Sequence, residues 1–306
     1  MQSLLIGIGA FAGGLWLLVE SVEGLIRSLR AWALAAGLSG VTVGALVLGF
    51  DIESTAAGVA ATLDDLPGTA LGASVGAAIF LVTFGLGVAA LIAPFQIRPP
   101  TAMLAAGAVA TVLSIALAAD GSLSRVDGAV LLAGFVPLLA AMVIWRPRDA
   151  APADGEPLER PRLLGVRVAG GLIGLVAGAE LLVFGTGRVV SELDLSETVF
   201  GLLVIAAAVS FEEVILEALP AFRGFPELSV GNALGTLVFL LTASLGVIVL
   251  ARPIDVPGAV TRYHLPALAL AVLLALALLT RGRLGRSQGL ALVAAYAAYV
   301  TGALIA

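Results

Sequence analysis

Five acidic residues lie within long apolar stretches of this 306-residue sequence, where a carboxylate is energetically unfavourable. Asp51 and Glu53 come at the end of one such stretch, and Glu212, Glu213 and Glu217 interrupt another. A carboxylate at the centre of a bilayer costs about 2.5–3.5 kcal/mol on insertion scales, and such residues mark sites for ions or protons. A hard cation such as Ca²⁺ would stabilise them, because Ca²⁺ binds about six to eight oxygen atoms of carboxylates, carbonyls, amides and hydroxyls. The sequence therefore predicts a site for a metal cation, made by Asp51, Glu53, Glu212 and Glu213.

Neutral oxygen donors lie in the apolar segments that follow each acidic group. Ser74 lies in a Gly-Ala-Ser-Val-Gly sequence, and Asn232 and Thr236 lie in a Gly-Asn-Ala-Leu-Gly-Thr sequence. We expect these three side chains to contribute to the cation site. The Gly-x-x-x-Gly spacing in both segments puts two glycines on one helix face, which would let another helix backbone come close.

The spacing of the acids places a condition on the helices that carry them. Successive side chains of an α-helix point about 100° apart, so Asp51 and Glu53 point about 200° apart on a regular helix. Both can face one cavity only if the helix unwinds there, and Gly49, just before them, suits such a break. The corresponding segment 206–210 offers no glycine for a break before Glu212.

The composition places this chemistry in a membrane and excludes several other kinds of site. Hydrophobic residues make up 60% of the chain and charged residues 12%, where a soluble protein has about 25% charged residues. The absence of cysteine excludes disulfides and zinc–thiolate clusters, and a single histidine, His264, excludes any mechanism that needs two imidazoles. All 16 basic residues are arginines, so there is no P-loop lysine, and their scattered positions do not form a nucleic-acid-binding stripe. We expect no enzyme activity, no resident cofactor and no nucleic-acid partner; the expected partners are inorganic cations and the lipid bilayer.

Ten segments are apolar and long enough to span a bilayer, which needs about 20 residues of helix. Eight contain no Asp, Glu or Arg, and two, 163–190 and 197–222, carry charged residues in their interior. The sequence therefore predicts an all-α integral membrane protein with ten transmembrane helices. The eight uncharged segments are 1–19, 31–50, 66–97, 99–119, 128–145, 228–251, 263–280 and 287–306.

The arginines predict the orientation of these helices. If the ten segments alternate across the membrane, 12 of the 16 arginines lie in the odd-numbered loops and adjoining helix ends, and 4 lie in the even-numbered ones. Arginine-rich loops stay in the cytoplasm, so we expect both termini outside the cell. The longest loop, 146–162, is rich in proline and charged residues, which is typical of a solvated, cytoplasmic linker. We expect a multi-pass protein of the cell membrane.

The two halves of the sequence repeat each other. A shift of 157 residues aligns Glu23 with Glu180, a shift of 159 aligns Gly72 with Gly231, and nine identities in the same order share these two shifts. Each copy holds five spans, an odd number, so the copies must lie inverted in the membrane. Inverted repeats with a site at their interface are an arrangement of secondary transporters, which work by alternating access. The expected units are a first five-helix repeat, 1–145, a linker, 146–162, and a second five-helix repeat, 163–306.

The second copy resembles the α-repeat of the sodium/calcium exchanger superfamily of cation antiporters. In that family a Gly-Thr-Ser-x-Pro-Glu sequence is followed by Gly-Asn-x-x-Gly-Ser-Asn. The counterparts here are 208–213, Ala-Val-Ser-Phe-Glu-Glu, and 231–237, Gly-Asn-Ala-Leu-Gly-Thr-Leu. The spacing between these sequences agrees with the family, and the resemblance places the two α-repeats at about 38–94 and 195–253. It extends to Gly-Ala-Glu-Leu-Leu-Val at 178–183 and so covers most of the chain.

The resemblance implies an antiporter that exchanges cations, Ca²⁺ and/or Na⁺, with H⁺ as a further candidate. In that family the glutamates of the two repeats and neighbouring Ser, Thr and Asn oxygens bind sodium and calcium. Carried onto this sequence, the ligands are the acids and neutral donors named above, together with Ser54 and Ser210.

Both copies depart from the family's sequence. Counting back from Gly72 puts Ser54 in the glutamate position and Glu53 in the proline position, and a shift of one residue would restore Glu53 as the ligand. In the second copy Glu212 replaces the proline. The family's Ser-Asn pair is Ala-Ala in the first copy and Thr-Leu in the second, so fewer neutral ligands are present.

Two other functions fit parts of the sequence. The altered first repeat is compatible with a relative that keeps the fold as a scaffold or partner-binding protein without transport. The segment around Ser74 also fits the Gly-x-Ser-x-Gly string of serine hydrolases, with His264 as the only available base, although that motif belongs on a strand–turn–helix.

Overall fold

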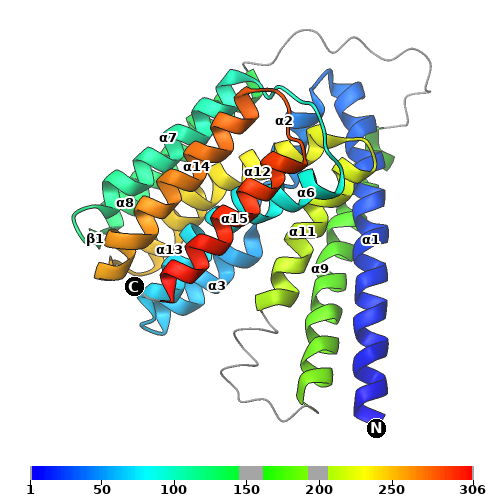
Figure 1. The fold of residues 1–306 in the computed structure, drawn as a ribbon, viewed down its shortest axis with the longest axis horizontal. Coiled ribbons are helices and arrows are strands. Elements are labelled where there is room, and N and C mark those ends of the chain that lie inside the picture. Colours follow the sequence, from blue (N-terminus) through cyan, green and yellow to red (C-terminus); the bar gives the residue numbers. More distant parts are fainter. Residues whose placement is uncertain (1, 145–160, 192–205, 305–306) are drawn as a thin grey trace.

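The structure is a computed structural model that describes residues 2–144, 161–191 and 206–304. Within these ranges it consists of helices and one pair of two-residue strands, as expected for an all-α membrane protein (Figure 1). The elements of the first half are α1 (Gln2–Ala36), α2 (Gly40–Val47), α3 (Ile52–Leu63), α4 (Pro67–Leu71), a π-helical turn (Gly72–Gly76), α5 (Ala77–Phe80), a second π-helical turn (Leu81–Gly85), α6 (Leu86–Ile92), α7 (Thr101–Ala118), β1 (Ser122–Leu123) and α8 (Arg125–Ile144). Those of the second half are α9 (Pro161–Ser191), α11 (Ala206–Phe222), α12 (Pro226–Phe239), a π-helical turn (Leu240–Ser244), α13 (Leu245–Ala251), β2 (Ile254–Asp255), a π-helical turn (Val260–His264), α14 (Leu265–Thr280) and α15 (Arg286–Ala303).

These elements form the expected membrane spans. Two helices, α11 and α15, lie within the expected seventh and tenth spans, of which residues 197–205 and 305–306 are outside the described part of the chain. With the eight spans that follow, the described helices agree with the expected all-α membrane fold of ten spans. The other eight spans, which are long and apolar enough to cross a membrane, are Leu5–Ala33, Gly40–Leu63, Pro67–Ile92, Thr101–Ala118, Arg125–Ile144, Leu164–Arg188, Pro226–Ala251 and Val260–Thr280.

The first two spans differ in position from the sequence prediction. The first uncharged segment ends at residue 19, but α1 continues through Ala36 and is 35 residues long. The second span therefore runs from Gly40 to Leu63 rather than over 31–50. As a result Asp51 lies near the middle of its span and not at its end.

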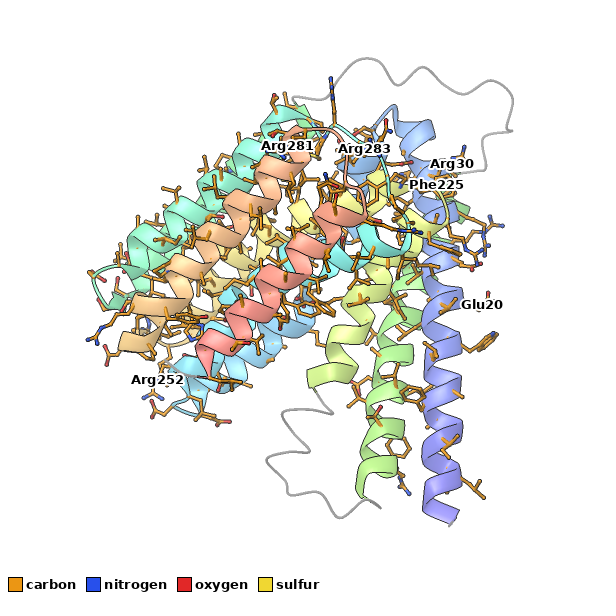
Figure 2. The ribbon with its side chains drawn as sticks, viewed as in Figure 1. Glu20, Arg30, Phe225, Arg252, Arg281 and Arg283 are labelled. Carbon is orange, nitrogen blue, oxygen red and sulfur yellow. The ribbon has the colours of Figure 1, made fainter. Side chains whose placement is uncertain are left out.

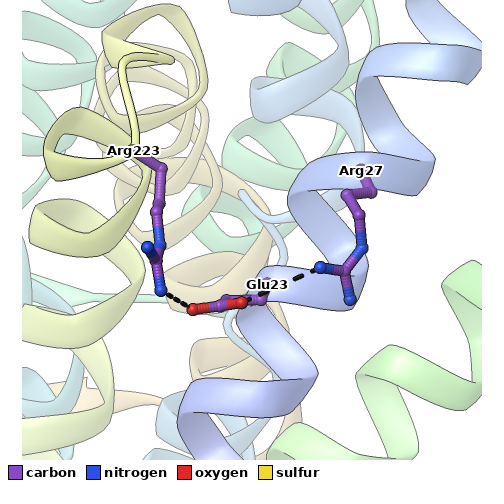
Figure 3. Close-up of polar contacts among 3 residues, drawn as sticks. All are labelled: Glu23, Arg27 and Arg223. Carbon is purple, nitrogen blue, oxygen red and sulfur yellow. Dashed lines mark hydrogen bonds and ion pairs between the residues drawn. The ribbon is translucent and has the colours of Figure 1, made fainter.

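Three charged residues inside α1, Glu23, Arg27 and Arg30, have partners, which explains why they do not end the helix. Glu23 pairs with Arg27 one turn later and with Arg223 just after α11 (Figure 3). The guanidinium of Arg30 stacks over the ring of Phe225, 4.8 Å from its centroid (Figure 2). Counting uncharged residues alone therefore ends this helix too early.

α1 and α9 lie side by side and stand beside the bundle formed by the other helices (Figure 1). Glycines bring the two backbones into contact: a Cβ on Gly14 would lie 2.6 Å from the amide nitrogen of Leu182, and a Cβ on Gly185 would lie 2.3 Å from that of Phe11. Buried side chains of this pair, such as Leu18, belong to one hydrophobic cluster, and those of the bundle form a second, larger one within the described residues. Both clusters include residues of α2, α11 and α12.

Backbone hydrogen bonds tie the two halves together on both sides of α7. β1 pairs antiparallel with β2, with Leu123 opposite Ile254. Before α7, Phe95 and Leu284 exchange two backbone hydrogen bonds of 2.9 and 3.0 Å. The halves therefore form one joined bundle.

Candidate cation-binding site

A cavity of about 230 Å³ lies between α9 and the helices that carry the intramembrane acids. Its apolar wall on the α9 side is made by Leu172, Leu175 and Val176. Seven of the nine side chains that the sequence places in a cation site line this one cavity. They are Asp51, Glu53, Ser54, Glu212, Glu213, Asn232 and Thr236.

The second span is broken at the acids, as the spacing of Asp51 and Glu53 predicts. α2 ends at Val47 and α3 begins at Ile52. Asp51 caps α3, because its carboxylate accepts a hydrogen bond of 2.8 Å from the backbone nitrogen of Ser54. A side chain at Gly49 has no room, since a Cβ there would lie 2.9 Å from the Cα of Gly235 on α12. The break thus brings the acids of the first half to the cavity.

The acids of the second half lie on α11, which is continuous from Ala206 to Phe222. Glu212 and Glu213 are one residue apart and both reach the cavity wall. Glu212 interacts electrostatically with Glu53 and Asp51, and Glu213 interacts with Asp51. Four carboxyl groups, two from each half of the chain, therefore meet in one cavity.

In the part of the chain that the structure describes, no three His, Cys, Asp or Glu side chains are arranged to hold a metal ion. Hard cations in proteins take neutral oxygens as well as carboxylates as ligands, so the neutral side chains of the cavity are of interest.

α12 carries two side chains with neutral oxygen atoms, Asn232 and Thr236, and both line the cavity. The helix lies against α2 with no space between the backbones: a Cβ on Gly231 would lie 2.3 Å from the carbonyl oxygen of Val41, and a Cβ on Gly235 would lie 2.6 Å from the Cα of Ala45. The Gly-x-x-x-Gly sequence of the second copy therefore serves close helix packing, as expected.

The first copy behaves differently. A Cβ on Gly72 or Gly76 would meet nothing within 4 Å, so the expectation of a close helix approach is wrong for this pair. Ser74 lies in the π-helical turn between these glycines and does not line the cavity. Its hydroxyl lies 3.4 Å from the hydroxyl of Ser244. The Ser244 hydroxyl accepts a hydrogen bond of 2.9 Å from the hydroxyl of Thr55. A π-helical turn holds an extra residue, so side-chain directions depart from those of the regular helix that the sequence spacing assumes.

Two side chains complete the account of the predicted ligands. Ser54, in the first turn of α3, lines the cavity beside Glu53. Ser210 lies on α11, but its side chain is outside the described residues.

Glu217 is an additional polar residue of this region that was not among the expected ligands. Its side chain is fully buried on α11, and its Oε1 accepts a hydrogen bond of 3.0 Å from the amide nitrogen of Asn232. A carboxylate within an apolar run, one helical turn after Glu213, is the sequence signal that points to it. The sequence alone does not show that its partner is Asn232.

Comparison with known proteins assigns this architecture to a family. A family model described as sodium/calcium exchanger protein matches residues 6–144 and 164–305. The chain belongs to the sodium/calcium exchanger family.

Relatives of this exchanger-family chain are membrane proteins. A proposed antiporter, CaxA, of Alkalimonas amylolytica is 30% identical over 296 residues, which cover 92% of this chain and 91% of the relative. The inner membrane protein YrbG of Escherichia coli is 26% identical over 285 residues, which cover 86% of each protein. The structure of the sodium-calcium exchanger NCX_Mj soaked with 100 mM Na⁺ and 10 mM Sr²⁺ shows the same fold, with a TM-score of 0.84 at 24% identity over 97% of this chain and 98% of that one.

Exchanger-family proteins are transporters and not enzymes, and the geometry around Ser74 agrees. Ser74 lies in a helix rather than on a strand–turn–helix, and its hydroxyl faces Ser244. The Nδ1 atom of His264 is 2.9 Å from the hydroxyl of Tyr299. The serine and the histidine therefore have other partners, and the hydrolase hypothesis is wrong.

Proposed function

We propose that this exchanger-family protein is a secondary active antiporter for Ca²⁺ and/or Na⁺, with H⁺ as a further candidate for exchange, and that it works by alternating access. The observation that carries the proposal is the cavity in which Asp51 and Glu53 of the first half meet Glu212 and Glu213 of the second. Carboxylates held this close repel one another, and a bound cation favours their ionised forms. Inside a membrane the negative charge of these carboxylates has to be neutralised, and a bound cation or protons can do this.

Each polar residue of the cavity has a role in this proposal. The four carboxylates supply the negative charge, and Ser54, Asn232 and Thr236 supply neutral oxygens. Ser210 is proposed as a further hydroxyl ligand from α11. The mixture of charged and neutral oxygens suits a hard cation, which prefers several oxygen ligands over a single acid.

Protons give the proposed exchange a release step. A carboxylate that binds a cation when ionised loses its attraction for the cation when it is protonated. A proton arriving at the cavity can therefore displace the cation, and cation/proton exchange follows from the same side chains.

The arrangement of the chain in the membrane is part of the proposal. We propose repeats at 1–145 and 163–306, joined by a cytoplasmic linker at 146–162, with both termini outside. One observation supports the division into repeats, and another supports the orientation. The two segments that match the family, 6–144 and 164–305, coincide with the halves. Arg30, Arg281 and Arg283 gather at one end of the bundle, and Arg252 lies at the other (Figure 2).

Purified protein in proteoliposomes tests the transport proposal. We expect uptake of Ca²⁺ or Na⁺ driven by an opposing gradient of Na⁺, Ca²⁺ or H⁺. Glu213→Gln should reduce the initial rate by about 100-fold or more, because it removes a carboxylate whose electrostatic worth in a low-dielectric site is several kcal/mol. Glu20→Gln, on α1 and outside the cavity, is the matched control and should transport normally.

The same samples separate a transporter from a relative without transport. A ligand raises the melting temperature of a protein only by binding its folded state. Cation-dependent stabilisation without flux would indicate a binding protein that keeps the fold. An absence of both flux and stabilisation, with no effect of Glu213→Gln, would overturn the proposal.

A further inference from the structure

Glu217 and Asn232 form a buried polar pair just behind the cavity wall. Asn232 lines the cavity and is 3% exposed, whereas Glu217 is fully buried and does not line it. The Oε1 atom of Glu217 accepts the hydrogen bond from Nδ2 of Asn232, and Oε2 has no hydrogen-bond partner among the described residues. Asn232 is therefore the polar contact of this acid.

The hydrogen bond decides which end of the Asn232 amide faces the cavity. An asparagine amide has an oxygen that can bind a cation and a nitrogen that can only donate hydrogen bonds. A carboxylate oxygen opposite the nitrogen holds it there, because a carboxylate only accepts hydrogen bonds and the reversed amide would place two acceptor oxygens against each other. Thr236 Oγ1, on the cavity wall, is 3.4 Å from Asn232 Oδ1, which agrees with this assignment. The amide oxygen is thus turned away from Glu217.

The first repeat shows that the fold does not require such a pair. The shift of 159 residues that aligns the repeats places Gly58 opposite Glu217 and Ala73 opposite Asn232. These positions are also neighbours in the structure, since a Cβ on Gly58 would lie 3.3 Å from the Cβ of Ala73. The same contact between helices is therefore apolar in one repeat and polar in the other. A buried carboxylate is costly in a membrane, so its presence on one side points to a function.

We infer that Glu217 is a positioning residue of the cation site, which holds the Asn232 amide with its oxygen available to the transported cation. The inference rests on the proposed function, because it concerns a ligand of the same site. Glu217 makes no contact with the cation itself and acts through Asn232, as partners of metal ligands do when they fix the orientation of those ligands.

Three substitutions test this inference. Glu217→Gln keeps a carbonyl oxygen for Asn232, whereas Glu217→Met keeps the length of the side chain and removes the acceptor. Loss of such an orienting partner typically costs about 10- to 100-fold in affinity for the metal. We therefore expect Glu217→Met to raise the apparent KM for Ca²⁺ or Na⁺ about tenfold or more with a smaller change in maximal rate, and Glu217→Gln to stay within about threefold of the unaltered protein. Ser229→Ala removes another buried polar atom, one without a partner, from α12 and should have no effect.

A double-mutant cycle distinguishes positioning from a direct role. If Glu217 acts through Asn232, Glu217→Met has no further effect on apparent KM in an Asn232→Ala background. The melting temperatures of all variants in detergent, with and without Ca²⁺ or Na⁺, show whether they are folded and provide a second measure of binding.

Each outcome has a separate meaning. Loss of transport in Glu217→Gln, or additive losses in the double variant, would overturn the inference and leave the proposed function intact. Equal affinity of Glu217→Met and the unaltered protein would also overturn it. If the unaltered protein shows neither flux nor cation-dependent stabilisation, the proposed function fails and the inference fails with it.

Discussion

The two repeats place similar helices around one cavity but supply it with different groups. In the second repeat, α12 brings Asn232 and Thr236 to the cavity wall. The corresponding positions of the first repeat, Ala73 and Ala77, carry no polar side chain, and the nearby Ser74 faces Ser244 instead. The first repeat, for its part, breaks its acid-bearing helix, whereas α11 of the second is continuous. The first repeat therefore provides the break and Ser54, and the second provides Asn232 and Thr236, so the polar lining of the cavity comes from both halves.

The Gly-x-x-x-Gly pairs of the two repeats also differ, in whether they bring another helix into backbone contact. Gly231 and Gly235 hold α12 in backbone contact with α2, whereas Gly72 and Gly76 face open space. Asn232 and Thr236, which line the cavity, thus lie on the span that is held tightly against the broken helix. Close backbone packing and cavity-lining polar side chains occur together on α12, and both are missing from the corresponding segment around Gly72 and Gly76.

The largest effect is expected from adding a methyl group to Gly235 in the second repeat, and little or none from adding one to Gly76 in the first. Gly235→Ala would place a Cβ 2.6 Å from the Cα and carbonyl oxygen of Ala45, and backbone atoms cannot move aside as a flexible side chain can. Overpacking of this kind costs about 1–3 kcal/mol or more. We expect Gly235→Ala to lower the melting temperature sharply or to prevent purification. Gly76→Ala should be neutral or stabilising, because alanine favours helix over glycine by about 1 kcal/mol. Equal destabilisation by both substitutions would remove the difference between the pairs.

The next largest effect is expected on cation binding when Asn232, rather than Ser74, is replaced by alanine. Asn232→Ala removes an oxygen from the cavity wall and should weaken cation binding about tenfold, which corresponds to about 1.4 kcal/mol. Ser74→Ala removes a hydroxyl outside the cavity and should change binding less than twofold. Cation-dependent melting of the purified variants measures both. A larger effect of Ser74→Ala than of Asn232→Ala would reverse the roles assigned to the repeats.

A smaller effect is expected at the helix break. Asp51 both caps α3 and lines the cavity. Asparagine caps a helix about as well as aspartate, whereas alanine costs about 1 kcal/mol at such a position. Asp51→Asn should therefore keep the melting temperature and weaken cation binding, and Asp51→Ala should lower both. If Asp51→Asn melts as early as Asp51→Ala, the cap does not stabilise the break.

The smallest effect is expected from two ion pairs near the ends of the acid-bearing spans. Asp65, after α3, pairs with Arg252 at 2.6 Å, and Arg223, after α11, pairs with Glu23 (Figure 3). Ion pairs in contact with solvent contribute about 0–1 kcal/mol and weaken in salt. We expect Asp65→Asn to have almost no effect on melting and Glu23→Gln a slightly larger one, because Glu23 is 21% exposed and Asp65 is 75% exposed. Melting at low and high salt compares them.

Much of this architecture could be predicted from the sequence because its main signals are strong. Carboxylates within apolar runs indicate a buried ionic site, and Gly49 beside two acids of incompatible direction indicates a broken helix. The end of α1 could not be predicted from its charges, because Glu23 pairs with Arg223 and Arg30 stacks on Phe225, and both partners are distant in sequence. Whether a glycine meets another helix depends on the neighbour, which the Gly-x-x-x-Gly spacing does not specify.

The placement of hydroxyls and amides was harder to predict for a related reason. The direction of Ser74 depends on a π-helical turn, which has no distinct residue signal. The partner of Glu217 lies on another helix, fifteen residues away in the chain. Period and composition locate the acids, but only the packed structure shows which of their neighbours line the cavity.

The lengths of α1 and α9 set how this protein fits its bilayer. At about 1.5 Å per residue, the apolar spans of these helices, Leu5–Ala33 and Leu164–Arg188, are longer than a hydrocarbon layer of about 30 Å. Such hydrophobic mismatch is relieved by tilting, by local thickening of the lipid or by extension into the headgroups. Because glycines lock the two backbones together, the helices have to tilt as one body. Changes in lipid thickness therefore act on the pair jointly and reach the apolar wall that α9 contributes to the cavity.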